Sequence, residues 1–369
     1  MRDNNRFRGC LIGGAAGDAL GYAVEFMRDV DIFKRYGTDG ITEYDLINGV
    51  AQISDDTQMT LFTATGLLIG TTRGMIRGIM GPYSGYIGSS YQDWLKTQEE
   101  HYPLPEEYHY SWLVDVPELF SCRAPGGTCL SALRAGGYGT IEKPINNSKG
   151  CGGVMRVAPI GLYFNDKHID IEKVDMIGAE AAAITHGHEL GYIPAAALVH
   201  IVHRLSQDDI AVEEAIQDSI EAAKALWPRA SSLEKFVSLM DKALQLAHGS
   251  EKDIDAIRQL GEGWVAEETL AIAAYCAVKY PSDFNKALIA SVNHSGDSDS
   301  TGAVTGNILG AKLGLTGIPQ KYITNLELMD VIREIADDLW HDCKIDEYTY
   351  DSDPDWEMKY FQNKRPKGK

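Results

Sequence analysis

The sequence predicts an all-α protein that folds as one compact helical bundle. Apolar and small residues recur at helical spacing in segment after segment, whereas the alternating pattern of a half-buried strand is scarce. The chain has 369 residues, of which 44% are hydrophobic, so it is long enough to bury a sizeable core. We expect a single domain over residues 1–345 and a C-terminal tail over residues 346–369.

The first periodic segment, residues 9–24, is rich in glycine and alanine and carries Asp18. Glycine recurs at every fourth position from residue 9 to residue 21, although each glycine costs about 1 kcal/mol of helix propensity relative to alanine. One face of this helix is therefore smooth, and we expect another element to approach it closely. Helical spacing also marks residues 61–68, 179–183, 195–205, 212–226, 233–247, 269–278 and 304–313.

Two stretches, residues 70–90 and 99–148, lack this periodicity. The first is rich in Gly, Met and Ser, and the second in Pro, Tyr and Gly. Irregular segments of this length inside a compact domain usually carry function. We predict that both stretches are loops that line a site.

Composition limits the partners and the location of the protein. A net charge of −19 argues against a nucleic-acid-binding surface, because phosphate backbones are held by clustered Lys and Arg. The polar start of the chain has no secretory signal, and residues 9–24 fall short of the ~20 apolar residues of a membrane span. Six cysteines without Cys-x-x-Cys pairs suggest neither a disulfide scaffold nor a zinc site. We expect a cytoplasmic protein with reduced thiols and no membrane contact, and its oligomeric state is open.

Two acidic clusters, residues 54–57 and 297–300, each stand at the start of a segment with helical character. The first alone is typical of a helix N-terminus, where Ser54 caps the helix and aspartates interact with its dipole. The second begins like a calcium-binding loop, but Ile308 stands where that loop needs a bidentate Glu. Together they supply carboxylate and hydroxyl oxygens, which suit Mg²⁺, Mn²⁺ or Ca²⁺. We predict a split metal site that only folding assembles.

A glycine-rich turn, residues 150–153, runs into an apolar segment that contains Arg156. It matches neither the Walker motif nor the dinucleotide fingerprint. Amides exposed by glycines can nevertheless hold a phosphate, and a tight turn with Arg156 in a salt bridge is the alternative. His186, His188 and His294 have no further ligands at zinc spacing, so zinc is not favoured.

In their order along the chain, these motifs closely resemble those of the ADP-ribosylglycohydrolase family. That family includes the enzyme that reactivates dinitrogenase reductase and hydrolases of ADP-ribosyl-arginine and ADP-ribosyl-serine. The motifs extend over residues 9 to about 315. They are Gly17-Asp18-Ala19-Leu20-Gly21 with Glu25, Ser54-Asp55-Asp56-Thr57, Gly152-Gly153-Val154-Met155-Arg156, Thr185-His186, Gly261-Glu262-Gly263-Trp264-Val265-Ala266-Glu267-Glu268 and Gly296-Asp297-Ser298-Asp299-Ser300.

The resemblance implies an all-α fold with two Mg²⁺ or Mn²⁺ ions in a central cleft. It implies hydrolysis of the N- or O-glycosidic bond between ADP-ribose and an acceptor. Glu25 is implied to lie on a mobile flap over the metals, and either Glu25 or Asp56 is the base. The implied metal ligands are Ser54, Asp55, Asp56, Asp297, Asp299 and Ser300, and the implied substrate contacts are Gly150, Gly152, Gly153 and His186.

The acceptor depends on the long loops, so the motifs leave it open. We expect ADP-ribosyl-arginine on a protein, with ADP-ribosyl-serine or a small-molecule conjugate of ADP-ribose as alternatives. A pseudoenzyme that binds ADP-ribose without turnover is a further alternative, although complete metal ligands argue against it. The residues that either form the cleft rim or pack within the loops are the segment 122–129 and the aromatic residues Tyr83, Tyr86, Tyr91, Trp94, Tyr108, Tyr110 and Trp112.

Overall fold

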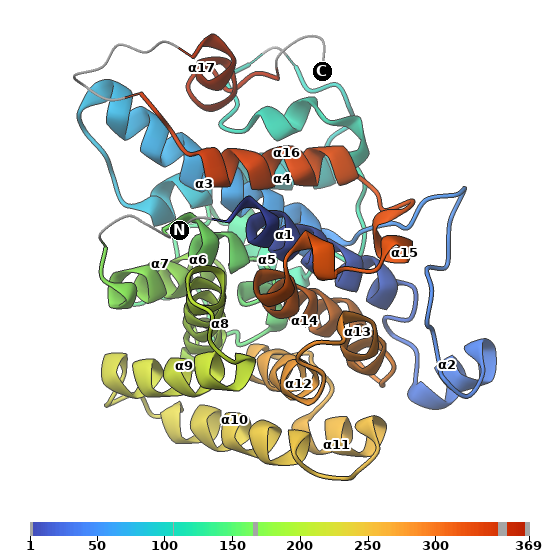
Figure 1. Ribbon diagram of the computed structural model, residues 1–369. Coiled ribbons are helices and arrows are strands. Elements are labelled where there is room, and N and C mark those ends of the chain that lie inside the picture. Colours follow the sequence, from blue (N-terminus) through green and yellow to red (C-terminus); the bar gives the residue numbers. More distant parts are fainter. Residues whose placement is uncertain (1–2, 106, 165–168, 346–352, 366–369) are drawn as a thin grey trace.

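The computed structural model describes residues 3–105, 107–164, 169–345 and 353–365, and its regular elements there are helices (Figure 1). The α-helices are α1 (Asn4–Tyr22), α2 (Asp29–Tyr36), α3 (Asp55–Arg77), α4 (Tyr83–Glu99), α5 (Gly127–Arg134), α6 (Ala158–Tyr163), α7 (Ile171–Ala183), α8 (Glu189–Gln207), α9 (Val212–Leu226), α10 (Leu233–Ala247), α11 (Asp253–Leu260), α12 (Ala266–Lys279), α13 (Phe284–Val292), α14 (Ser298–Leu313), α15 (Gln320–Ile323), α16 (Met329–His341) and α17 (Pro354–Tyr360). Short 3-10 helices are η1 (Trp112–Asp115), η2 (Pro117–Leu119), η3 (Cys151–Gly153) and η4 (Leu315–Gly317). Extended pairing in the described residues is limited to isolated bridges, so the predicted all-α class is confirmed.

Helices α1 and α14 form an antiparallel pair at the centre of the molecule (Figure 1). A Cβ on Gly17 would lie 2.0 Å from the carbonyl oxygen of Gly302, and a Cβ on Gly306 would lie 1.9 Å from that of Gly13. The two glycine faces therefore touch backbone to backbone. The close approach predicted from the glycine spacing is confirmed, and the approaching element is the helix that carries the second acidic cluster.

Other helices enclose this pair on two sides. Figure 1 shows α3, α4 and α16 on one side, and α8, α9, α10 and α12 on the other. Helix α8 is buried along nearly its whole length, which fits its apolar sequence. The predicted helices over residues 212–226 and 233–247 coincide with α9 and α10.

A carboxylate near the C-terminus of α1 attaches α3 to the central pair. Asp18 is fully buried and accepts hydrogen bonds from the Ser54 amide at 2.9 Å and the Thr57 amide at 3.0 Å. The Thr57 hydroxyl donates to the same carboxylate. The N-terminus of α3 is therefore held beside the C-terminal half of α1, close to the N-terminus of α14.

The prediction of a loop over residues 70–90 is wrong. Helix α3 continues to Arg77 and α4 begins at Tyr83, so only a short connection separates them. The glycines that suggested a loop allow the two helices to pack closely: a Cβ on Gly70 would lie 2.8 Å from the Tyr86 ring. Residues 99–148 agree better with the prediction, although they contain α5, η1 and η2.

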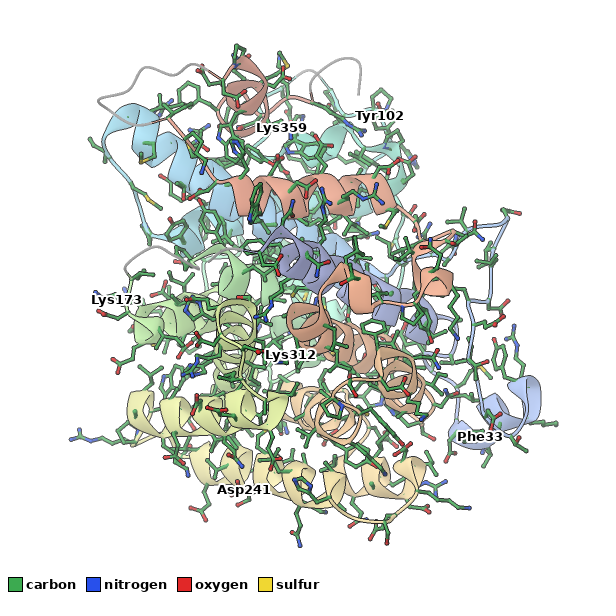
Figure 2. All side chains as sticks on the ribbon, viewed as in Figure 1. Phe33, Tyr102, Lys173, Asp241, Lys312 and Lys359 are labelled. Atoms are coloured by element: carbon green, nitrogen blue, oxygen red, sulfur yellow. The ribbon has the colours of Figure 1, made fainter. Side chains whose placement is uncertain are left out.

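Part of the segment expected as a tail packs on the domain. In α17, Trp356 is buried and its Nε1 donates to Thr72 Oγ1 of α3 at 3.0 Å. Lys359, labelled in Figure 2, pairs with Asp338 and Glu334 of α16. The remainder of the tail, residues 346–352 and 366–369, lies outside the described residues.

None of the helices in the described ranges is long and apolar enough to cross a bilayer. The expected cytoplasmic location stays a prediction.

The contact between α1 and α14 predicts the effect of added methyl groups. Gly17→Ala places a Cβ within 2.0 Å of the Gly302 carbonyl oxygen, so the helices must separate. We expect a loss of stability of about 3 kcal/mol or more, measured as a lower urea midpoint. The matched control is Gly85→Ala in α4, where a Cβ meets nothing within 4 Å and a gain of about 0.5 kcal/mol is expected. Equal effects of the two substitutions would contradict this account.

Candidate functional site

A cavity of about 330 Å³ opens where the C-terminus of α1 meets the N-termini of α3 and α14. Its walls also include η3 and the loop before α5. Most site residues expected from the sequence lie together in its lining, namely Glu25, Asp55, Asp56, Gly150, Gly152, His186, Asp297, Asp299 and Ser300. The other two, Ser54 and Gly153, are buried behind the wall.

The first acidic cluster begins α3. Ser54 caps the helix, and its hydroxyl accepts from the Asp56 amide at 3.2 Å, so the expected N-cap is confirmed. The Asp55 carboxylate accepts from the Gly126 amide at 3.3 Å. Asp56 Oδ2 is buried and has no hydrogen-bond partner among the described residues. The cap thus orients two carboxylates, of which one presents an unsatisfied oxygen.

The second acidic cluster begins α14. Asp297 is the N-cap and accepts from the Ser300 amide at 3.2 Å, and the Cys151 thiol donates to its other oxygen at 2.8 Å. The Asp299 carboxylate accepts from the Ser300 amide at 2.9 Å. The residues after Asp297 form a regular helix, which agrees with the rejection of a calcium-binding loop. His294 is buried and bonds Thr301 Oγ1 at 2.9 Å, so it supports packing.

Glu25 reaches the two clusters from the turn that follows α1. Its carboxyl group lies within hydrogen-bond reach of Asp299, and its Oε2 has no partner in the described part of the chain. The next residue, Phe26, adopts the left-handed conformation with φ 64° and is 69% exposed. Its ring stacks on Trp264 at a centroid distance of 5.5 Å. This aromatic pair lies at the edge of the cavity, next to Glu25.

Burial and mutual repulsion raise the pKa of the clustered carboxyls. The pKa of Asp18 rises to about 7 and that of Glu25 to about 11, mainly through burial and then through the charge of Asp299. The pKa values of Asp55, Asp56 and Asp299 lie well above the usual range for the same reason of burial. Burial therefore disfavours the ionised form of these carboxyls, and a bound cation would favour it.

The donor set fits a hard divalent cation. Carboxylate and hydroxyl oxygens are the ligands that Mg²⁺ and Mn²⁺ prefer, and the unpartnered oxygen of Asp56 lies among them. Within the described ranges, however, no group of three or more His, Cys, Asp or Glu side chains is arranged to hold a metal ion. The binuclear centre and its six ligands therefore stay predictions.

Another part of the cavity wall is formed by the glycine turn and His186, and the turn contacts the second acidic cluster through Cys151 and Asp297. A Cβ on Gly150 would lie 3.2 Å from His186 Nε2, and one on Gly152 would lie 3.0 Å from its Cε1. Two amides of the turn are used within the protein, because Gly150 donates to Ser148 Oγ and Cys151 donates to the Trp264 carbonyl. Only part of the turn is therefore free to bind an anion.

Arg156 does not form the salt bridge considered above. Its side chain is fully buried, and its guanidinium lies 4.3 Å from the centroid of the Tyr91 ring. It donates to the Ala181 carbonyl at 3.1 Å and to Thr185 Oγ1 at 2.7 Å. Within the part of the chain that the structure describes, the partners of this guanidinium are uncharged. A buried positive charge is thus held behind His186.

The residues at the edge of the cavity agree only in part with those predicted for the cleft rim. Residues 124–129 line the cavity, which supports the prediction for that loop. Tyr91, Trp94 and Trp112 are instead fully buried in the core. The aromatic side chains at the edge are Phe26 and Trp264, whose association through separate loops no sequence signal reveals.

Asp18 was also not assigned a role from the sequence. It does not line the cavity, but it orients Ser54 and Thr57 at the start of α3. The sequence did contain a signal for such a role, because Asp18 is the only carboxylate in α1.

Comparison with known proteins finds relatives along nearly the whole chain. The family model described as ADP-ribosylglycohydrolase matches residues 1–348. ADP-ribosylhydrolase ARH3 of Danio rerio is 27% identical over 364 residues, which cover 90% of this chain and 89% of that protein. The ADP-ribosyl-[dinitrogen reductase] glycohydrolase of Rhodospirillum rubrum is 26% identical over 340 residues, covering 90% of this chain and 93% of that protein.

A solved structure described as an ADP-ribosylglycohydrolase-related protein complex shares the fold. Its TM-score is 0.51 at 22% identity, and the match covers 92% of this chain and 98% of that chain. Because the family match extends over nearly the whole sequence, the chain belongs to the ADP-ribosylglycohydrolase family.

Proposed function

We propose that the protein is a metal-dependent hydrolase that removes ADP-ribose from the arginine side chains of ADP-ribosylated proteins. The observation that carries the proposal is the meeting of both acidic clusters and Glu25 in one cavity that a glycine turn and His186 also line. One wall suits cations and ribose hydroxyls, and the other offers hydrogen-bond donors. An ADP-ribose conjugate needs both kinds of wall, because its ribose is polar and its pyrophosphate is anionic.

Two Mg²⁺ or Mn²⁺ ions would be held by Ser54, Asp55 and Asp56 of α3 and by the second cluster, namely Asp297, Asp299 and Ser300. The raised pKa values of the buried aspartates support this assignment, since bound cations relieve their repulsion. When bound, such a metal pair fixes vicinal hydroxyls and lowers the pKa of water.

The protein's own groups have separate tasks in this proposal. Glycosidic cleavage passes through an oxocarbenium-like transition state, which nearby carboxylates stabilise. Asp56 and Glu25 each have one buried oxygen without a hydrogen-bond partner among the described residues. Bound cations would lower the pKa of both carboxyls, and either group, once ionised, would be suited to accept the proton of the attacking water. Gly150, Gly152 and His186, which line the cavity, would face the pyrophosphate, and Gly153 would support the turn from behind the wall. Glu25 belongs to a turn rather than a helix, which suits the movement of a flap.

Arginine is the proposed acceptor because of the cavity edge. The exposed rings of Phe26 and Trp264 offer a surface on which a guanidinium can stack. The net charge of −19 also favours a cationic acceptor over an acidic one. The name of the Rhodospirillum rubrum relative describes action on an ADP-ribosylated protein, which is consistent with a protein substrate.

Removing divalent cations tests the proposed function. EDTA should abolish turnover of ADP-ribosylated arginine, and Mg²⁺ or Mn²⁺ should restore it. The same cations should raise the thermal midpoint, because a ligand that binds only the folded state stabilises it by about 2.7 kcal/mol at 100 times its Kd. Tight ADP-ribose binding without turnover under every metal would instead indicate a binding protein.

Two substitutions test the proposed roles of Asp56 as a metal ligand and of Glu25 as the carboxylate of a flap. Asp56→Asn should lose turnover and also the cation-induced rise in thermal midpoint, because it removes a metal ligand. Glu25→Gln should lower kcat by about 100-fold or more and keep the rise. The matched control is Asp330→Asn, an exposed aspartate in the first turn of α16. Near-normal turnover by Asp56→Asn would contradict the assignment of Asp56 as a metal ligand.

Acceptor preference is measured with a panel of defined conjugates. Purified protein is assayed with arginine-, serine- and DNA-linked ADP-ribose in the presence of Mg²⁺ or Mn²⁺. We expect the largest kcat/KM for the arginine conjugate, because its guanidinium can stack at the cavity edge. A preference for serine-linked ADP-ribose would transfer the proposal to O-linked substrates and leave the metal chemistry unchanged.

A further inference from the structure

A chain of hydrogen bonds connects a buried arginine to the histidine in the cavity wall. We propose that Arg156 and Thr185 are positioning residues that hold His186 in the tautomer with its proton on Nε2, so that the ring donates a hydrogen bond to an anion in the cavity. The anion, the pyrophosphate of ADP-ribose, rests on the proposed function. The tautomer does not, because it follows from contacts within the chain.

The chain begins with a group that can only donate. A guanidinium has five N–H donors and no acceptor. Arg156 Nη2 lies 2.7 Å from Thr185 Oγ1, so the threonine oxygen accepts this bond. The Tyr91 ring and the Ala181 carbonyl hold the guanidinium in place, and its full burial prevents exchange for water.

The threonine hydroxyl then has one proton to donate. Thr185 is fully buried, and its Oγ1 lies 2.8 Å from His186 Nδ1. The Cys129 thiol is also close, but sulfur is a weak acceptor compared with a ring nitrogen. A buried hydroxyl proton without a partner costs about 1–3 kcal/mol. The hydroxyl therefore donates to Nδ1, and Nδ1 carries no proton.

The ring is neutral, so its single proton is on Nε2. Burial, followed by the positive charge of Arg156, lowers the pKa of His186 to about 3. A neutral imidazole whose Nδ1 accepts must carry its hydrogen on the other nitrogen.

The Nε2 atom faces the glycine turn. A Cβ on Gly150 would lie 3.2 Å from this atom, so the glycine leaves room for a ligand beside it. His186 lines the same cavity as the aspartates, where a neutral N–H donor can bind phosphate oxygens.

The tautomer is measured directly by ¹⁵N NMR of the histidine rings in the full chain. The protein has 10 histidines, so the His186 signals are identified by comparison with His186→Asn. We expect the wild-type ring to show a protonated Nε2 and an unprotonated Nδ1. A ring protonated on Nδ1, or on both nitrogens, overturns the proposal without any further variant.

The role of Thr185 is tested by two variants and a matched control. Thr185→Val, which is nearly isosteric, should populate the second tautomer and weaken ADP-ribose binding in calorimetry by about tenfold, whereas Thr185→Ser should retain the wild-type tautomer. Thr97→Val removes another buried hydroxyl, which donates to the Trp94 carbonyl, and controls for stability. An unchanged tautomer in Thr185→Val contradicts the role of Thr185.

Measurements of ADP-ribose binding and turnover distinguish failure of this inference from failure of the proposed function. In Thr185→Val, KM for the conjugate should rise about tenfold and kcat should change little, because the bond to the pyrophosphate is present in both the ground and transition states. A wild-type protein with the expected tautomer and no affinity for ADP-ribose overturns the pyrophosphate contact and the proposed function, and leaves the tautomer standing. A wild-type protein that hydrolyses the conjugate but has the other tautomer overturns only the inference.

Discussion

Backbone contact between α1 and α14 determines where every carboxylate of the site lies. Facing glycines allow the two helices to meet without intervening side chains, as the 2.0 Å between a Cβ on Gly17 and the Gly302 carbonyl shows. The contact is antiparallel, so the end of α1 meets the beginning of α14. Glu25 and Asp299 thereby come together although 273 positions separate them along the chain (299 − 25 − 1). Asp18 extends the arrangement to α3 through the Ser54 and Thr57 amides.

The consequence is a group of closely spaced carboxyl side chains in a buried part of the cavity wall. The cap interactions of Ser54 and Asp297 orient the aspartates, but among the described residues they leave Asp56 Oδ2 without a hydrogen-bond partner. Buried clusters of carboxyl groups with shifted pKa values are typical of functional sites, where stability is exchanged for activity. Burial, followed by the charge of Asp299, raises the pKa of Glu25 in this cluster.

Behind another part of the cavity wall lies a buried positive charge. The described partners of Arg156 are uncharged, and a hydrogen bond from Arg156 to Thr185 and one between Thr185 and His186 connect the guanidinium to the histidine ring. The glycine turn keeps the space beside the ring open. A cavity with an acidic wall, a donor wall and an aromatic edge can distinguish three parts of one substrate, and the proposed ADP-ribosyl-arginine has three parts of matching chemistry.

The sequence by itself determined the helical class, the glycine face of α1 and the residues of both acidic clusters, because these depend on local spacing and residue type. It failed over residues 70–90, since a glycine that breaks a helix and one that admits a neighbouring helix look alike in a single chain. Only the tertiary structure decided that Asp18 bonds the start of α3, that Phe26 stacks on Trp264, and that Arg156 bonds Thr185. Each of these is a contact between segments distant in the sequence, which local spacing and residue type do not encode.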